Sequence, residues 1–504
     1  MINEKVKTVF ITRAALVGIL MVILSFSFLG EKMAVNEGAG WDGDFYREFA
    51  RSFDTQIKEG GYSIYTIQRI APFALINVVY NSFGISKDNA SLMVGVCILN
   101  IISIIISVCY FFKISTWFRF SSTIEMIGFA SLFFTFPVLK NSGYNPFYTD
   151  IFALTAMLAA YYFFLKKRMI KLLLIGILSA FIWQTSWVII LFLLFFPNQK
   201  FNLVDKSVKQ TKGVSASGIV CKIIVLLYAL AALFFMVYFL YIKQRDLLPV
   251  FFAFNNEKKP LLLLGFSLLL FLIFMYRTMK DVRFDLFVWL KAFFKSVKPL
   301  NILLFLSAYL LMFAFQYKLS NPEIHSPYTI YSTIYRLIGE PLLMPLRFLE
   351  AHFVYYGLLP VLVVLCWKRI LPLLGNYGTG YFFAMVYFLI FATQSESRFS
   401  INMLPFIVFP LLVVFSELQF KKWVPVAYII IQIILSKCWL RINVDGIVEG
   451  FAKFDYLNFP SQRFFMEYGN FQNNEMYGIF FALMIIFTGI VYVCHKKRYL
   501  YVKQ

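Results

Sequence analysis

The sequence predicts an all-α fold, a polytopic transmembrane helical bundle of about 12–14 spans. Three observations lead to this prediction. Of the 504 residues, 60% are hydrophobic and only 14% are charged. The mean hydropathy is +0.74, well above what a soluble chain of this length needs to cover its surface. Apolar runs close to 20 residues recur along the chain, the length that a helix needs to cross a bilayer.

The spans predicted from these runs are separated by short polar segments. Lys171 to Pro197 is too long for one span, and the polar group at 183–186 in its middle predicts a hairpin of two short helices. The predicted spans cover 10–29, 90–112, 124–139, 151–165, the hairpin 171–197, 219–242, 261–275, 300–315, 354–367, 381–393, 401–415, 424–435 and 477–494. A helix lying on the inner surface is expected over 284–298.

The net charge of +21 raises the possibility of a nucleic-acid partner, but the positions of the charges exclude it. Basic residues gather in short clusters between apolar runs, and every strong cluster falls on the same side of the predicted topology. This is the positive-inside pattern of a multi-pass cell-membrane protein. It places both termini in the cytoplasm. The first run, about residues 10–29, lacks a signal-peptidase site and is expected to remain as a span.

The chain is expected to form one integral membrane domain, 1–504, without a separate soluble enzyme domain. Its first extracytoplasmic loop, 30–89, is predicted to hold two amphipathic surface helices at 44–58 and 64–83. In the first, apolar residues recur every four positions and share one face, which we expect to lie in the acyl boundary: Phe45, Phe49, Phe53 and Ile57. Gly60-Gly61 is expected to end that helix.

Carboxylates and arginines are the residues on which chemistry can rest in this chain. It has only three histidines, and its six cysteines lie mostly inside apolar runs without a CxxC pair. Three features are predicted on the outer face near headgroup depth: Trp41-Asp42-Gly43-Asp44, Asp150 after the Tyr144-Asn145-Pro146 turn, and Glu396-Ser397-Arg398. Alternatives remain for each, because Asp42 and Asp150 could be helix N-caps and Arg398 a snorkelling anchor.

The first of these features resembles the signature of the GT-C superfamily of integral membrane glycosyltransferases. The pattern D-x-x-x-Y-x-x-x-A is formed here by Asp42, Tyr46 and Ala50. Asp150 in N-P-F-Y-T-D is similar to the second acidic residue of many members, and Arg398-Phe399 followed by Pro405 is similar to a late R-[FY]…P pattern. Gly43 departs from the family, whose best-known members have adjacent acidic residues, so either Asp42 or Asp44 could be the catalytic one.

The resemblance implies an inverting glycosyltransferase that takes a sugar from a polyprenyl-phosphate donor to an acceptor hydroxyl on a glycan or lipid, outside the cytoplasm. Asp42 would be the base, and Asp44 or Asp150 would orient the acceptor or hold a divalent cation. Arg398, with Arg69, would neutralise the leaving phosphate, and Glu396 would contact substrate. Trp41, Tyr46 and Tyr144 would stack on sugar rings.

Two other classes remain open: a flippase or transporter for lipid-linked sugars, and an O-antigen-type glycan polymerase. A transporter should show charges at mid-membrane and repeated halves. The centres of the predicted spans are almost free of charge and the first-loop pattern has no second copy, so the sequence favours the enzyme.

Overall fold

The computed structural model describes residues 2–198, 216–237, 294–324, 346–452 and 474–496, with a few isolated positions between these ranges. Every regular element in these ranges is a helix, and an isolated β-bridge pairs Met33 with Gly38. The all-α prediction is confirmed for this part of the chain. Most of the span predicted over 261–275 and most of the inner helix predicted over 284–298 lie outside the described residues.

Six helices in the described part of the chain are long and apolar enough to cross a membrane, or seven if one bent pair counts as a span. Four of the six expose many large apolar side chains, whereas Ser397–Ser416 is mostly buried; Leu311 of α15 (Pro299–Leu319), for example, is 70% exposed. Exposed apolar surface of this extent is what a lipid-facing helix presents. The six ranges are Lys7–Leu29, Asn89–Phe118, Pro299–Leu319, Leu359–Tyr377, Ser397–Ser416 and Glu475–Lys496. The larger number of 12–14 spans stays a prediction.

Several predicted spans are shorter or broken in the structure. The span expected over 124–139 is two pieces, α6 (Ser122–Phe133) and η1–α7 (Pro137–Tyr144), bent by 54°. The span predicted over 354–367 begins later in the structure: α17 (Arg347–Tyr356) ends at Gly357, and the candidate span Leu359–Tyr377 starts after it with α18 (Leu359–Leu374). Gly357 has a φ of 67°, a left-handed conformation that interrupts a helix and favours glycine.

The hairpin predicted at 171–197 is present. α9 (Met169–Ser179) and α10 (Gln184–Phe195) pack against each other, and the chain turns between them at 180–183. The remaining helices with apolar faces include α11 (Ala216–Val237), α19 (Thr379–Phe391) and α21 (Trp423–Leu435).

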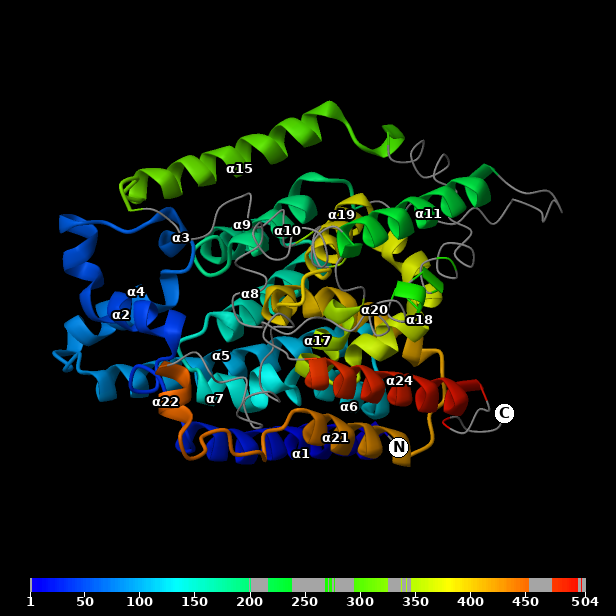
Figure 1. Ribbon diagram of the computed structural model, residues 1–504, viewed down its shortest axis with the longest axis horizontal. Helices are drawn as coiled ribbons and strands as arrows, with labels where there is room; N and C mark the ends of the chain where they lie inside the picture. Colours follow the sequence, from blue (N-terminus) through cyan, green and yellow to red (C-terminus); the bar gives the residue numbers. More distant parts are fainter. Residues whose placement is uncertain are drawn as a thin grey trace.

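The long helices run roughly side by side in Figure 1, which gives the bundle two distinct ends. α1 (Ile2–Leu29) begins and α24 (Asn474–Lys496) ends at one of them, while α2 (Trp41–Glu59) and α4 (Ala71–Phe83) lie at the other. Inside the bundle, α8 (Asp150–Leu165) packs between α5 (Asn89–Phe118), α9 and α20 (Leu404–Ser416). α8 is therefore mostly enclosed by protein.

α2 and α4 form a small layer with an apolar core of its own. Tyr46 stacks on Phe73 with ring centroids 4.9 Å apart, and Asn77 donates to the carbonyl of Ala50 at 3.1 Å. The expectation that the phenylalanine face of α2 lies in lipid is wrong for Phe49, which is only 7% exposed, because α4 covers it. Phe45 is 68% exposed and points away from this core.

Candidate active site

Asp42 lies in the first turn of α2. The helix starts after Gly40, whose side-chain-free backbone takes a φ of 78°, and no side chain caps it. Asp42 is therefore not the N-cap, and that alternative is wrong. A Cβ added at Gly43 would lie 3.1 Å from Cβ of Phe147, tighter than side chains normally pack. Glycine at 43 thus allows the start of α2 to approach the segment that leads into α8.

Asp150 begins α8 and is buried, with 2% of its surface exposed. Its Oδ2 accepts a hydrogen bond from the hydroxyl of Tyr355 at 2.9 Å, and its Oδ1 accepts one from Nε of Arg398 at 3.3 Å. Thr149 is the N-cap residue of α8, so the N-cap alternative for Asp150 is also wrong. A buried carboxylate needs such partners, because an isolated charge in an apolar interior is very costly.

Arg398 connects the two predicted carboxylates. It lies in the 3₁₀ segment η4 (Ser397–Met403), where Nη1 is 4.0 Å from Oδ2 of Asp42 and Nε donates to Asp150. The guanidinium carbon also lies 3.9 Å from the ring centroid of Tyr148. The residue is 3% exposed, which contradicts the alternative of a snorkelling anchor. Three segments far apart in sequence therefore meet at one guanidinium.

A second arginine, Arg69, lies against the same indole ring as Arg398. The centroid of Trp183 is 5.3 Å from the guanidinium carbon of Arg69 and 5.9 Å from that of Arg398. Arg69 also stacks on Tyr65 at 3.8 Å. No carboxylate of a described residue lies within ion-pair distance of Arg69, whereas Arg398 is shared by two. Trp183 sits at the α9–α10 turn and so joins the hairpin to this group.

Side chains of α17 hold the segment that carries Arg398 through hydrogen bonds to Ser397. The hydroxyl of Tyr356 donates to the carbonyl of Ser397 at 2.7 Å. Nδ1 of His352 is 2.9 Å from Oγ of Ser397, and its Nε2 is 2.8 Å from the carbonyl oxygen of Ala392. Burial lowers the pKa of His352 from 6.5 to about 4, so its ring is neutral at physiological pH.

The other predicted site residues are divided between this group and its surroundings. Asp44 forms an ion pair with Arg47 at 2.6 Å. Of the two aspartates at the start of α2, Asp42 is therefore the one beside Arg398. Tyr46 is 3% exposed and stacked, so it offers no free face to a sugar, and burial raises the pKa of its phenol. Trp41 is half-buried at the start of α2.

Glu396 and Tyr144 complete the predicted set. Glu396 directly precedes η4 and is close enough to Tyr65 to act on it electrostatically. The hydroxyl of Tyr144 donates to Oδ1 of Asn443 at 2.9 Å, in a different polar group. There Lys140 pairs with Glu31 at 2.8 Å. Tyr144 therefore directs its polar end to that group.

The possible divalent cation does not fit between Asp42 and Asp150. The guanidinium of Arg398 already fills the position between the two carboxylates and carries the positive charge there. Among the residues that the structure describes, no three His, Cys, Asp or Glu side chains are grouped as metal ligands. Charge in this group is balanced by arginine.

Sequence reasoning missed Tyr148 and Tyr355, and did not assign Trp183 to the site. Tyr148 stands in the same N-P-F-Y-T-D motif as Asp150, so its place in the motif was an available signal. Tyr355 is 205 positions from Asp150 and carries no local signal. Its role emerges only from the tertiary fold, which brings the Tyr355 hydroxyl of α17 to Asp150 at the start of α8.

The fold and this group of side chains define an all-helical protein with helices long and apolar enough to span a membrane, and with a buried arginine–aspartate cluster where α2 meets the start of α8. Comparison with protein-family models, with curated proteins and with solved structures finds no match for the chain. A functional proposal therefore has to rest on the residues of the cluster.

Proposed function

We propose that the chain is a membrane glycosyltransferase that moves a sugar from a polyprenyl-phosphate donor to an acceptor hydroxyl on the extracytoplasmic face. The observation that supports the proposal most directly is that Asp42 and Asp150 both lie beside the guanidinium of Arg398. A carboxylate can accept the proton of an attacking hydroxyl, and a neighbouring arginine can bind the departing phosphate. The residues that meet are those on which the likeness to the GT-C superfamily rests.

Asp42 is the base in this proposal. Its side chain is 41% exposed, while the side chains of Arg398 and Asp150 are 4% and 3% exposed. Asp42 is thus the carboxylate of the cluster that a substrate can reach. In one displacement, the acceptor oxygen bonds to the anomeric carbon, the proton passes to Asp42, and the bond to the phosphate oxygen breaks. The phosphate leaves with the electron pair, and the configuration inverts.

Asp150 serves as a positioning residue for Arg398. Both of its oxygens are engaged, one by Tyr355 and one by Arg398. A carboxylate so enclosed is unsuited to binding an acceptor, but it fixes the plane of the guanidinium. Arg398 in turn holds Asp42 in place.

Arg69 is the better partner for the leaving phosphate. Arg398 is shared between two carboxylates, and the described residues supply no carboxylate to Arg69. Its positive charge is therefore the less compensated of the two. Because Arg69 is only 2% exposed, the donor phosphate reaches it only after the side chains that cover it move aside. A charge-assisted bond from arginine to a phosphate oxygen is about twice as strong as a neutral one. Stacking on Tyr65 and Trp183 holds the guanidinium at a fixed place in the cluster.

The surroundings of the cluster suit a donor that stays in the bilayer. α4 packs on α2 through one face and leaves the other apolar and exposed: Leu75, Val78, Val79 and Phe83. A surface of this kind matches an interfacial helix at the membrane boundary. It supports the proposal that loop 30–89 holds the cluster at headgroup depth, within one multi-pass domain of 12–14 spans in the cell membrane.

The test is turnover by the purified full-length chain in proteoliposomes that contain a panel of polyprenyl-phosphate sugars. Release of polyprenyl phosphate that depends on an added acceptor supports the proposal. Movement of labelled donor between leaflets without release would instead identify a flippase. Extension of a lipid-linked glycan on a pyrophosphate carrier, with no turnover of monophosphate donors, would identify a polymerase.

A further inference from the structure

A second group of charged residues lies at the other end of α8. Asp150 begins this helix and Lys166 follows it, so its 16 residues separate the two groups by about 24 Å. That distance is close to the hydrocarbon thickness of a bilayer, about 30 Å. The second group is thus remote from the Arg398 cluster.

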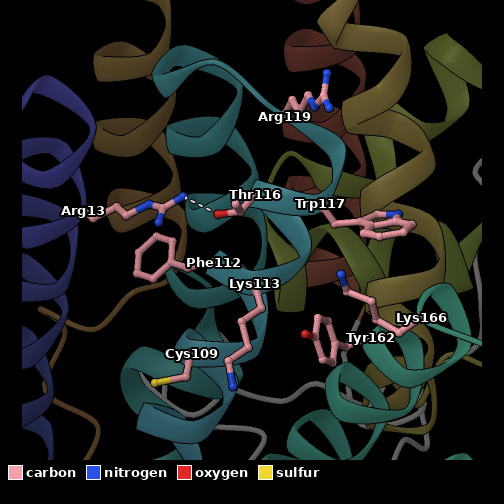
Figure 2. A pocket seen from close by; sticks show the side chains of 9 residues that line it. All are labelled: Arg13, Cys109, Phe112, Lys113, Thr116, Trp117, Arg119, Tyr162 and Lys166. Carbon is pink, nitrogen blue, oxygen red and sulfur yellow. Dashed lines mark hydrogen bonds between the residues drawn. The ribbon is translucent and has the colours of Figure 1, made fainter. Parts of the chain in front are cut away.

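These residues line an open pocket of about 810 Å³ where α1, α5 and α8 converge. Figure 2 shows Arg13 reaching it from α1, Lys113 and Trp117 from α5, and Lys166 from the end of α8. Four of its nine lining residues are basic and none is acidic. The pocket is within the size range of small-ligand sites.

One of the four cations is neutralised and the other three are not. Nε and Nη2 of Arg13 each donate to a carboxylate oxygen of Glu125 at 2.8 Å. Lys113 and Lys166 instead lie over aromatic rings; Lys166 is 4.2 Å from the centroid of Trp117. No described carboxylate pairs with Lys113, Lys166 or Arg119. A cation near the C-terminus of a helix is common, because it interacts favourably with the helix dipole. Helix capping alone does not explain why cations from three helices line the same cavity.

The walls beside the pocket are apolar and exposed. Ile102, Ile106, Cys109 and Lys113 recur on one face of α5 at helical spacing, and all four are exposed. Trp117, 46% exposed, stands at the rim, as tryptophan does at membrane interfaces. A free phosphate would use the cations alone. A phospholipid would use the cations for its headgroup and the isoleucine stripe for an acyl chain.

We propose that this pocket binds the headgroup of an anionic phospholipid, with Lys113, Arg119 and Lys166 on the phosphate and an acyl chain along Ile102 and Ile106. Basic pockets between membrane helices recognise such headgroups in this way. The proposal is independent of the sugar-transfer reaction, since none of its residues belongs to the Arg398 cluster.

Native mass spectrometry of the full chain tests the proposal, in micelles that contain either phosphatidylglycerol or phosphatidylcholine. We expect retained phosphatidylglycerol and little phosphatidylcholine. Lys113→Gln/Lys166→Gln should weaken phosphatidylglycerol binding on the order of 30-fold, and Arg119→Gln alone about fivefold. The matched control is Lys167→Gln/Arg168→Gln, which removes two neighbouring exposed charges that do not line the pocket. Unchanged elution and helicity establish that each variant folds.

Two results would overturn the proposal. One is equal loss of lipid in the pocket and control variants, or no loss in either, because the binding would then be general charge attraction. The other is full competition by soluble glycerol 3-phosphate at the concentration at which the lipid binds. That result would assign the pocket to a free phosphate-bearing anion.

Discussion

Nε of Arg398 donates to Oδ1 of Asp150 at 3.3 Å, and both side chains are almost completely buried. The pair joins the late segment η4 to the start of α8 across 248 positions of sequence. Nη1 of the same guanidinium lies 4.0 Å from Oδ2 of Asp42, so the pair also fixes where the start of α2 meets the bundle.

Asp150→Asn should destabilise the protein strongly. Removing one charge of a buried pair leaves the other uncompensated, which costs about 3–5 kcal/mol. Thermal unfolding of the detergent-solubilised chain measures the effect as a lower Tm. Glu48→Gln is the control, because the side chain of Glu48 is 53% exposed and its ion pair with Arg51 should contribute little. Equal Tm values for the two variants would contradict a structural role for Asp150.

Tyr355→Phe should produce a smaller loss of stability than Asp150→Asn. The hydroxyl of Tyr355 supplies one of the two bonds to the buried carboxylate, and its removal leaves that oxygen unsatisfied at a cost of about 1–3 kcal/mol. The Michaelis constant for the donor should stay near the wild-type value. A rise in that constant with unchanged Tm would place Tyr355 in the substrate site.

Arg69→Gln should weaken use of the phosphate-linked donor, and Tm is measured beside activity because Arg69 is only 2% exposed and contacts Tyr65 and Trp183. Loss of a charge-assisted bond of about 1.5–3 kcal/mol corresponds to a fall in kcat/KM of roughly 10- to 150-fold. Arg51→Gln is the control, since Arg51 lies on the outer part of α2 and pairs with Glu48 and Asn89. If the two variants lose activity equally, Arg69 has no special place in the reaction.

Stability should fall as the pH drops from 6.5 towards 4, in part through His352. The folded state lowers the pKa of this residue to about 4, whereas the unfolded chain has the ordinary value of 6.5. Above pH 6.5 both states hold a neutral ring, so the residue has no effect on stability. Below it the unfolded state takes up the proton first, and the difference reaches about 3 kcal/mol at pH 4.

The comparison that checks this is Tm against pH for the wild type and His352→Gln. The variant should lose part of the slope between pH 6.5 and 4, with little change in slope between pH 7 and 8. Parallel curves over the acid range would show that other groups control the acid sensitivity.

The helical fold and the three residues that lie together at the Arg398 cluster could be predicted because their signals are local. Apolar runs marked the helices, and short motifs marked Asp42, Asp150 and Arg398. What covers the apolar face of a helix cannot be read from its local sequence. The period of four predicted an apolar face on α2, but Phe49 packs against α4, where lipid was expected. Gly357 interrupts the span predicted over 354–367 because its backbone is left-handed, which an apolar run in the sequence does not reveal. Tyr355 reaches Asp150 only through the tertiary packing of α17.

The most direct test of the central claim compares Asp42→Asn with Asp44→Asn in the polyprenyl-phosphate release assay. General-base catalysis contributes about 10²–10⁴-fold in rate, so Asp42→Asn should lower release by at least 100-fold with unchanged Tm and membrane insertion. Asp44→Asn, which removes only a pair with Arg47, should stay within a few-fold of wild type. Wild-type release from Asp42→Asn would contradict the assignment of Asp42 as the base and, with it, the proposed reaction at this cluster.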